Sequence, residues 1–194
     1  FVDLFNVFIS GFKYEIIFDQ TEVATIKQCE LITGATNTAG IWLVNGDDHS
    51  VGANTGFTNR ITITENQFNS ASGPTWNIID DGGVNHVIDN NNFNGAAECC
   101  RFAGVLGLSF VGNEIEGHTS NSVLFEDTTL DASNYVGPVM GATVEANACS
   151  DVVAAHYDIR AMVGGRIASN NSTQYLGSMI VFQNSSSNKS AGVI

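Results

Sequence analysis

A phrase of eight residues recurs along the whole chain and constrains its fold more than any other feature. It reads apolar, any, apolar, any, any, Asn, any, apolar, and its clearest copies are residues 61–68, 86–93 and 108–115. Weaker copies at 142–149 and 165–172 carry Asn147 and Asn170, and in degenerate copies at 5–12 and 24–31 Ser10 and Cys29 replace the Asn. A repeat of this period indicates stacked supersecondary units.

Each phrase alternates apolar and polar residues, which predicts a strand with one buried face. The closest copies are about 19 to 25 residues apart, too short for a βαβ unit but suited to one turn of a β-solenoid. The anchor residues are Val7, Ile26, Ile63, Ile88, Phe110, Val144 and Ile167. A second, more continuously apolar strand follows each anchor, at 14–18, 41–44, 76–79, 99–102, 122–125, 152–157 and 178–182.

The repeated Asn has a physical explanation. Asn tolerates a left-handed bend between strands, and its amide can bond to the backbone and to the Asn of the next coil. We therefore expect a column of stacked Asn side chains. Cys99 and Cys100 are adjacent, so a regular strand would turn them to opposite faces.

The phrase resembles that of the right-handed parallel β-helix in the pectate-lyase-like superfamily, and most closely bacteriophage tailspikes and polysaccharide depolymerases. The resemblance covers residues 5 to 184, about seven coils, and leaves 185–194 as a polar tail or linker. It implies an all-β fold and a homotrimer that binds a bacterial surface polysaccharide, placed on a virion or outside the cell. Fold alone does not assign chemistry.

Composition narrows the classes of partner. A chain of 194 residues with a net charge of −13 and no basic stripe fits one domain and excludes nucleic acid as a partner. No apolar run is long enough to predict membrane insertion. Neither end of the solenoid has an obvious polar cap, so we expect a piece of a longer chain or a subunit whose ends are covered.

Two corners of the repeat are longer than the others. Residues 44–63 and 125–144 connect a second strand to the next anchor on coils two and five, so both insertions should flank coils three and four. A groove between them would suit a sugar. Its predicted substrate-binding residues are Asp47, Asp48, His49, Phe57, Arg101 and Tyr135. The alternative is that the insertions only decorate the surface.

Carboxyl groups in this groove suggest hydrolysis. Asp80 and Asp81 follow the second strand of coil three, and Glu126 and Asp127 follow that of coil five. Two coils are about 9.6 Å apart, near the upper limit for the two acids of an inverting glycosidase. We therefore predict one acid from each pair as the catalytic residues. The alternative is that these acids only form turns after the strands.

Other functions stay open. A polysaccharide lyase would need a base and a cation, and Asp47, Asp48, Asp80 and Asp81 could offer oxygen ligands to Ca²⁺. The four His show no zinc-binding spacing, and no other cofactor motif occurs, so no cofactor apart from Ca²⁺ is expected. The remaining hypotheses are a depolymerase, a non-catalytic carbohydrate-binding module and a purely structural β-helix.

Overall fold

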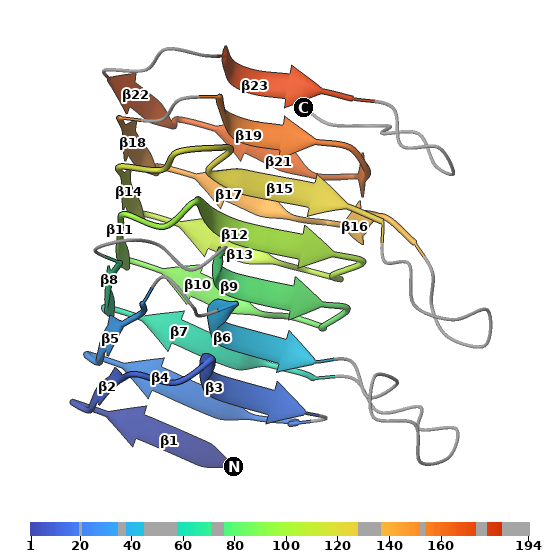
Figure 1. Cartoon of the computed structure of the whole chain (residues 1–194). Helices are drawn as coiled ribbons and strands as arrows, with labels where there is room; N and C mark the ends of the chain where they lie inside the picture. Colours follow the sequence, from blue (N-terminus) through green and yellow to red (C-terminus); the bar gives the residue numbers. More distant parts are fainter. Residues whose placement is uncertain are drawn as a thin grey trace.

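The chain winds in successive coils around one core, and its strands form three parallel sheets (Figure 1). The structure is a computed structural model, and it describes residues 1–19, 21–34, 38–44, 58–70, 76–127, 137–151, 154–173 and 178–183. Each sheet has seven strands, and each strand pairs with its equivalents one coil before and one coil after. The fold is therefore a right-handed parallel β-helix of about seven coils, as the repeat predicts. The predicted tail at 185–194 lies outside the described residues.

Every coil contributes one strand to each sheet. Sheet A consists of β1 (Val2–Phe5), β4 (Ala24–Lys27), β7 (Ile61–Thr64), β10 (Val87–Asp89), β13 (Ser109–Val111), β17 (Thr143–Glu145) and β21 (Arg166–Ala168). Sheet B consists of β2 (Phe8–Ser10), β5 (Glu30–Ile32), β8 (Gln67–Asn69), β11 (Asn92–Asn94), β14 (Glu114–Glu116), β18 (Ala148–Ser150) and β22 (Asn171–Thr173). Sheet C consists of β3 (Tyr14–Asp19), β6 (Ala39–Val44), β9 (Trp76–Asp81), β12 (Glu98–Ala103), β15 (Val123–Glu126), β19 (Ala155–Ile159) and β23 (Ser178–Phe182).

The eight-residue phrase spans two strands and a bend, not one strand. Its first half lies in sheet A, its last apolar residue lies in sheet B, and the residue before the Asn makes the bend. That residue has a φ between 53° and 67° in all seven coils: Asn6, Gln28, Glu65, Asn90, Gly112, Ala146 and Ser169. The expectation that the repeated Asn itself is left-handed is therefore wrong, because its amide is used differently.

The repeated Asn side chains form a continuous column, as predicted. We call Asn66, Asn91, Asn113, Asn147 and Asn170 the Asn ladder. The amide nitrogens of the first four members donate to the amide oxygen of the next member over 2.9–3.1 Å, and all five donate to a backbone carbonyl of the preceding coil. Each amide oxygen in turn accepts a backbone N–H of the preceding coil. The ladder therefore satisfies the polar groups of the A–B bend.

The first coil is offset from the predicted alignment by three residues. Leu4, not Val7, pairs with Ile26 in sheet A, and Val7 occupies the position of the repeated Asn. The offset arises because Val7 to Ile9 are all apolar and disguise the alternation. Ser10 therefore has no equivalence to the Asn ladder.

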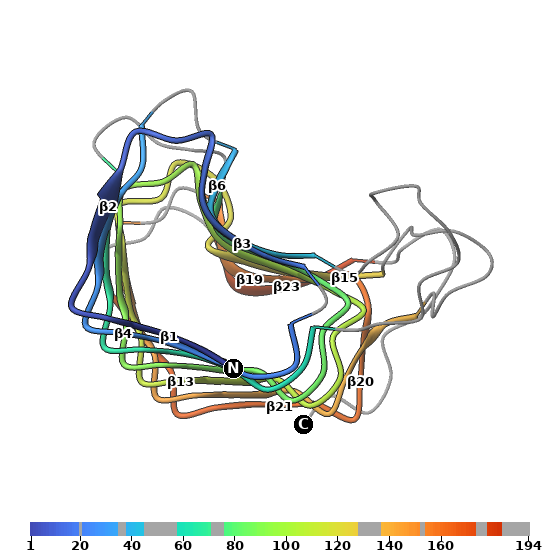
Figure 2. The same cartoon turned by 90° about the horizontal axis from the view of Figure 1, so that it is seen from below.

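The core is a stack of apolar side chains enclosed by the three sheets (Figure 2). Aromatic rings run through its centre: Phe68 and Phe93 stack with centroids 4.7 Å apart, and Phe102 lies 5.7 Å from Phe110 and 5.5 Å from Phe125. All five rings are fully buried. Because parallel neighbours share one register, like side chains stack over like and the coils hold a common spacing.

Strand β12 departs from a regular pleat at Cys99 and Cys100, which changes which side chains enter the core. The amides of Cys99 and Cys100 both donate to the carbonyl of Ser122, the pattern of a β-bulge. Both Cys side chains are consequently buried, with their Sγ atoms 3.4 Å apart. The expectation that they face opposite ways is wrong, since it assumes a regular strand. Burial raises the pKa of the Cys99 thiol well above its usual range.

The corner between sheets C and A is partly described. A short fourth ladder crosses it, with β16 (Val139–Met140) pairing with β20 (Met162–Val163) and bridges joining Asn59, Val84, Leu106 and Met140. Most of the two long insertions, at 45–57 and 128–136, lies outside the described residues. Figure 2 shows that the chain path bends inward along sheet C.

Candidate binding face on sheet C

Register determines which side chains of sheet C point outward. After the bulge, residues alternate, and Ile41, Ile78 and Phe102 enter the core. One outward row therefore contains Ile17, Trp42, Ile79, Arg101, Leu124, Asp158 and Val181. A second outward row contains Asp81, Ala103 and Glu126. Together with a third row that contains Tyr14, Ala39, Trp76 and Glu98, they form the outer face of sheet C.

Aromatic residues gather at the first three coils of this face. The rings of Tyr14 and Trp42 stack 4.9 Å apart at 25°, and both are partly exposed. They pack against a small apolar cluster that is separate from the main core and contains Ala39, Trp76, Ile79 and Leu124. Lys13 Nζ lies 5.3 Å from the centroid of the Tyr14 ring. An exposed aromatic pair on a flat sheet can stack against an apolar face of a ligand.

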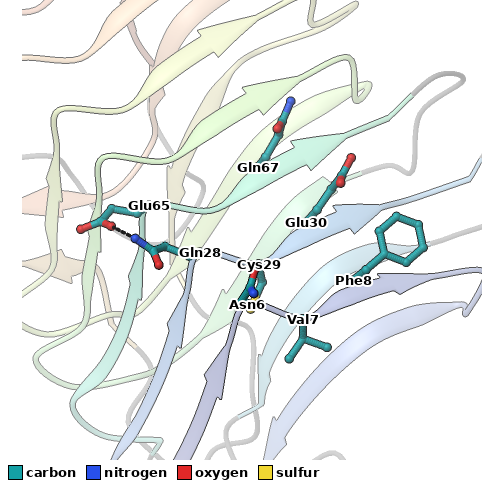
Figure 3. A pocket seen from close by; sticks show the side chains of 8 residues that line it. All are labelled: Asn6, Val7, Phe8, Gln28, Cys29, Glu30, Glu65 and Gln67. Carbon is teal, nitrogen blue, oxygen red and sulfur yellow. Dashed lines mark hydrogen bonds between the residues drawn. The ribbon is translucent and has the colours of Figure 1, made fainter.

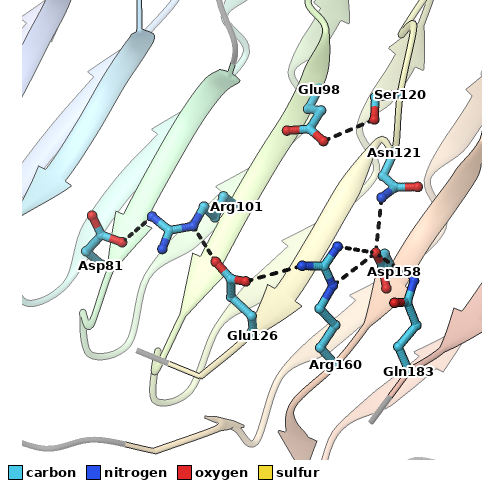
Figure 4. A network of polar contacts seen from close by, with 9 residues as sticks. All are labelled: Asp81, Glu98, Arg101, Ser120, Asn121, Glu126, Asp158, Arg160 and Gln183. Carbon is cyan, nitrogen blue, oxygen red and sulfur yellow. Dashed lines mark hydrogen bonds and ion pairs between the residues drawn. The ribbon is translucent and has the colours of Figure 1, made fainter. Parts of the chain in front are cut away.

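A chain of charged side chains continues from the aromatic pair along the helix axis (Figure 4). Trp42 Nε1 donates to Asp81 Oδ2 over 2.8 Å, and Arg101 Nη1 donates to Asp81 Oδ1 over 2.7 Å. Arg101 Nε then donates to Glu126 Oε1 over 2.5 Å. Arg160 Nη1 lies 3.7 Å from Glu126 Oε2, and Arg160 Nη2 lies 2.9 Å from Asp158 Oδ2. We call Asp81, Arg101, Glu126, Arg160 and Asp158 the charged row.

The charged row differs in exposure from end to end. The side chains of Arg101 and Arg160 are 25% and 37% exposed, whereas that of Asp158 is 1% exposed. Asp158 Oδ2 accepts from Asn121, Arg160 and Gln183, while its buried Oδ1 accepts no hydrogen bond. Because guanidinium groups bridge successive carboxylates, the row presents alternating charges to a ligand.

Glu98 adds to the same face a carboxyl group with a raised pKa. It begins β12, and its Oε1 accepts from Ser120 Oγ over 3.1 Å. Burial raises the pKa of Glu98, and the hydrogen bond from Ser120 offsets part of that shift. Glu98 therefore holds a proton to a higher pH than an exposed glutamate.

The structure brings two of the four predicted catalytic carboxylates together. Asp81 and Glu126 lie in one row, two strands apart, as the spacing predicts. The guanidinium of Arg101, a predicted substrate-binding residue, lies between them and contacts both. It occupies the space in which a sugar and a water molecule would lie between two catalytic acids. Their catalytic role stays a prediction.

The other two predicted acids, Asp80 and Asp127, are buried. Asp80 faces the core and is fully buried, with Oδ2 2.7 Å from His86 Nδ1 and Oδ1 accepting from the Gly83 amide. Burial opposes a charge on His86, but the attraction of Asp80 outweighs it and raises the pKa of His86. Asp127 follows β15 and is 7% exposed. The catalytic roles of Asp80 and Asp127 stay predictions.

The remaining predictions for the groove cannot be placed on the fold. Asp47, Asp48, His49, Phe57 and Tyr135 lie outside the described residues. Asp80 and Asp81 point to opposite sides of β9, so they do not form a joint Ca²⁺ site. Among the residues that the structure describes, no group of three or more His, Cys, Asp or Glu side chains could hold a metal ion.

Sequence reasoning missed several residues of this face. Tyr14 and Trp42 were read only as members of an apolar strand, and Glu98, Asp158 and Arg160 were not singled out. The signal was present in the register: Trp42, Arg101 and Asp158 occupy equivalent outward positions. The bulge in β12 conceals only Glu98, because a strict period of two counted back from Arg101 assigns Glu98 to the core face.

Comparisons with known proteins support the fold and leave the family open. No protein-family model matches the sequence, and no curated protein matches it either. The chain is similar in structure to the Streptococcus pneumoniae surface protein and adhesin PfbA, with a TM-score of 0.51 and 12% identity. The match covers 93% of this chain and 66% of that one. At this identity the similarity concerns the β-helix alone. In the described part of the chain, no helix is long and apolar enough to cross a membrane.

Proposed function

We propose that this protein is a binding module that holds a bacterial surface polysaccharide against the outer face of sheet C. The observation that carries the proposal is the continuity of the Tyr14–Trp42 stack with the charged row through the bond from Trp42 to Asp81. Aromatic rings stack on the apolar faces of sugars, and guanidinium and carboxylate groups bind hydroxyl groups or acidic substituents. An extended chain could follow the row from coil to coil.

The proposed function requires the module to lie outside a bacterial cell. A phage tailspike or a surface adhesin would both present the face outside a bacterial cell, and the adhesin similarity is compatible with either. We retain the homotrimer as part of the tailspike alternative. Light scattering coupled to size-exclusion chromatography distinguishes a trimer from a monomer.

A glycan microarray of bacterial capsules and O-antigens tests the binding function. We expect the wild type to retain at least one polysaccharide and Trp42→Ala and Arg101→Met to lose it. Thr62→Ala, on the outer face of sheet A, serves as the matched control and should bind normally. Retention of the same polysaccharide by both sheet C variants would contradict the proposal.

Hydrolysis is the second candidate function, and Glu98 is the observation that favours it. A glycosidase acid must hold a proton near neutral pH, and burial raises the pKa of Glu98 in that direction. The test is release of reducing ends from the retained polysaccharide, with absorbance for unsaturated uronates measured in parallel. Release that Glu98→Gln abolishes would establish hydrolysis, whereas unsaturated products would indicate a lyase. No release would leave the binding function alone.

A further inference from the structure

A pocket of about 330 Å³ opens on the bend between sheets A and B, away from the outer face of sheet C (Figure 3). Two rows of side chains from coils one to three form its walls. The first wall consists of left-handed residues, Asn6, Gln28 and Glu65. The second wall is a register-matched row on sheet B: Phe8, Glu30 and Gln67.

The pocket lies where the Asn ladder ends. Its floor is formed by Cys29 and Val7, which occupy the ladder position in coils two and one. The Cys29 amide still donates to Asn66 Oδ1 over 2.9 Å. The Val7 amide has no equivalent acceptor, because Cys29 carries a thiol where later coils carry a carbonyl oxygen. The Cys29 thiol instead donates to the carbonyls of Leu4 and Lys27, so no amide side chain joins coils one and two at the bend.

The walls combine one exposed ring with several polar groups. Phe8 is 61% exposed, and its register neighbours Glu30 and Gln67 are polar. Gln28 Nε2 donates to Glu65 Oε2 over 2.8 Å, and Asn69 donates to Glu30 Oε1 over 2.9 Å. These bonds orient both carboxylates, and the bond from Asn69 uses one of the two oxygens of Glu30.

We infer that this pocket binds a single hexose unit that is neutral or carries an amino group, and that it rejects uronates. Phe8 offers a surface for the C–H face of the ring, while amides and carboxylates bind its hydroxyl groups. A volume of about 330 Å³ lies at the small end of ligand pockets, which suits one ring. Glu30, on a chain of net charge −13, repels a carboxylated sugar, whereas Glu65 is paired with Lys27 Nζ over 3.0 Å.

The proposal is tested by amide chemical-shift titration of the ¹⁵N-labelled protein. The ligands are methyl glucoside, methyl galactoside, N-acetylglucosamine, glucosamine and glucuronate. We expect saturable shifts at Val7, Cys29 and Gln67 with at least one of the first four and none with glucuronate. Absence of saturable shifts at these residues with all five sugars would overturn the proposal, as would tightest binding of glucuronate.

Two substitutions separate the pocket from its surroundings. Phe8→Ala should weaken binding by about fivefold to tenfold, because it removes the stacking ring. Phe12→Ala is the matched control, since Phe12 is also 61% exposed but does not line the pocket. Glu30→Gln should allow glucuronate to bind. Equal affinities of the Phe8 and Phe12 variants would contradict the assignment.

The outcome is independent of the function proposed for sheet C. Trp42→Ala should leave the sugar-induced shifts at the pocket unchanged. If Trp42→Ala removes them and Phe8→Ala does not, the sugar binds on sheet C and the pocket has no such role. Thermal unfolding of each variant confirms that the fold is retained.

Discussion

The Asn ladder and the charged row are both columns of polar side chains along the helix axis, but they are built in opposite ways. The ladder repeats one uncharged side chain, and its members from Asn66 to Asn147 are at most 2% exposed and donate to two acceptors each. The charged row changes residue at every coil and is partly exposed. Repetition therefore marks the scaffold, and departure from repetition marks a surface that stacking does not require.

Two adjacent residues show the same contrast within one strand. Asp80 faces the core, where it pairs with His86, and Asp81 faces outward, where it bonds to Trp42 and Arg101. The pleat of a strand assigns neighbours to opposite faces. The adjacent acids thus serve the scaffold and the candidate site separately.

Substitution of these two acids gives the largest expected difference. Asp80→Ala leaves the buried His86 without its partner and should lower the free energy of unfolding by about 4 kcal/mol. Asp81→Ala removes partly exposed contacts and should cost less than about 1 kcal/mol. Urea denaturation of both variants measures the difference. Equal losses would break the distinction between scaffold and site.

The Asn ladder can be tested with neighbouring asparagines. Asn91→Ala removes the hydrogen bonds to Asn66, Asn113 and the Ile63 carbonyl and leaves buried partners unsatisfied. We expect a loss of about 3 to 4 kcal/mol in unfolding free energy. Asn92→Ala is the control, since Asn92 points outward to Glu114 and should cost less than about 0.5 kcal/mol. A tolerated Asn91→Ala would show that the ladder does not support the bend.

The pH dependence of stability sharpens the contrast between uncharged and charged buried groups. Burial lowers the pKa of His118 to about 4, so the unfolded chain binds the proton first as the pH falls below 6.5. Neutral His118 contributes its full stabilisation above pH 6.5. As the pH falls toward 4, this contribution to the free energy of unfolding, about 3 kcal/mol, is lost. His156 changes in the same direction because burial also lowers its pKa.

His86 has the opposite effect. Because the pKa of His86 is raised, its pairing with Asp80 stabilises the folded protein fully below the pKa that His86 has in the unfolded chain. This stabilisation is lost as the pH rises through the pKa of His86 in the folded protein. Unfolding free energies of the wild type and His118→Gln between pH 4 and 8 separate these contributions. The variant should lose less stability on acidification, and an unchanged pH profile would exclude His118 as a cause.

A small effect on stability is also expected of Arg101→Met, on the candidate binding face. Arg101 contacts Asp81 and Glu126 on a face where all three side chains are 17–25% exposed. Its removal should change the unfolding free energy by less than about 1 kcal/mol, while polysaccharide binding is lost. Denaturation and array binding measured on one preparation test this. A large destabilisation would assign the charged row to the scaffold.

The fold could be predicted from the sequence because the same pattern of strand, bend and strand recurs in seven copies. Each copy places an apolar residue before and after a bend, and the Asn column fixes the register between coils. The first copy was aligned wrongly because Val7 replaces the Asn and the two residues after it, Phe8 and Ile9, are apolar. Repetition thus gives reliable information where it is regular and fails where a coil departs from it.

The candidate site was predicted only in part, for the same reason. The two-coil spacing placed Asp81 and Glu126 in one row with Arg101 between them. The bulge at Cys99 could not be read from the sequence, so the outward position of Glu98 was missed, and Trp42 was missed because its strand is apolar throughout. Asp80 was grouped with Asp81 because adjacency in sequence does not reveal which face of β9 each occupies.

Hydrogen–deuterium exchange with the retained polysaccharide tests the central claim most directly. Amides of β6, β9, β12 and β15 are to be compared with those of β8, β11 and β14 in the presence and absence of the polysaccharide. We predict added protection in the sheet C strands and none in the sheet B strands. Protection confined to sheet B, or none in sheet C, would contradict the assignment of the binding face.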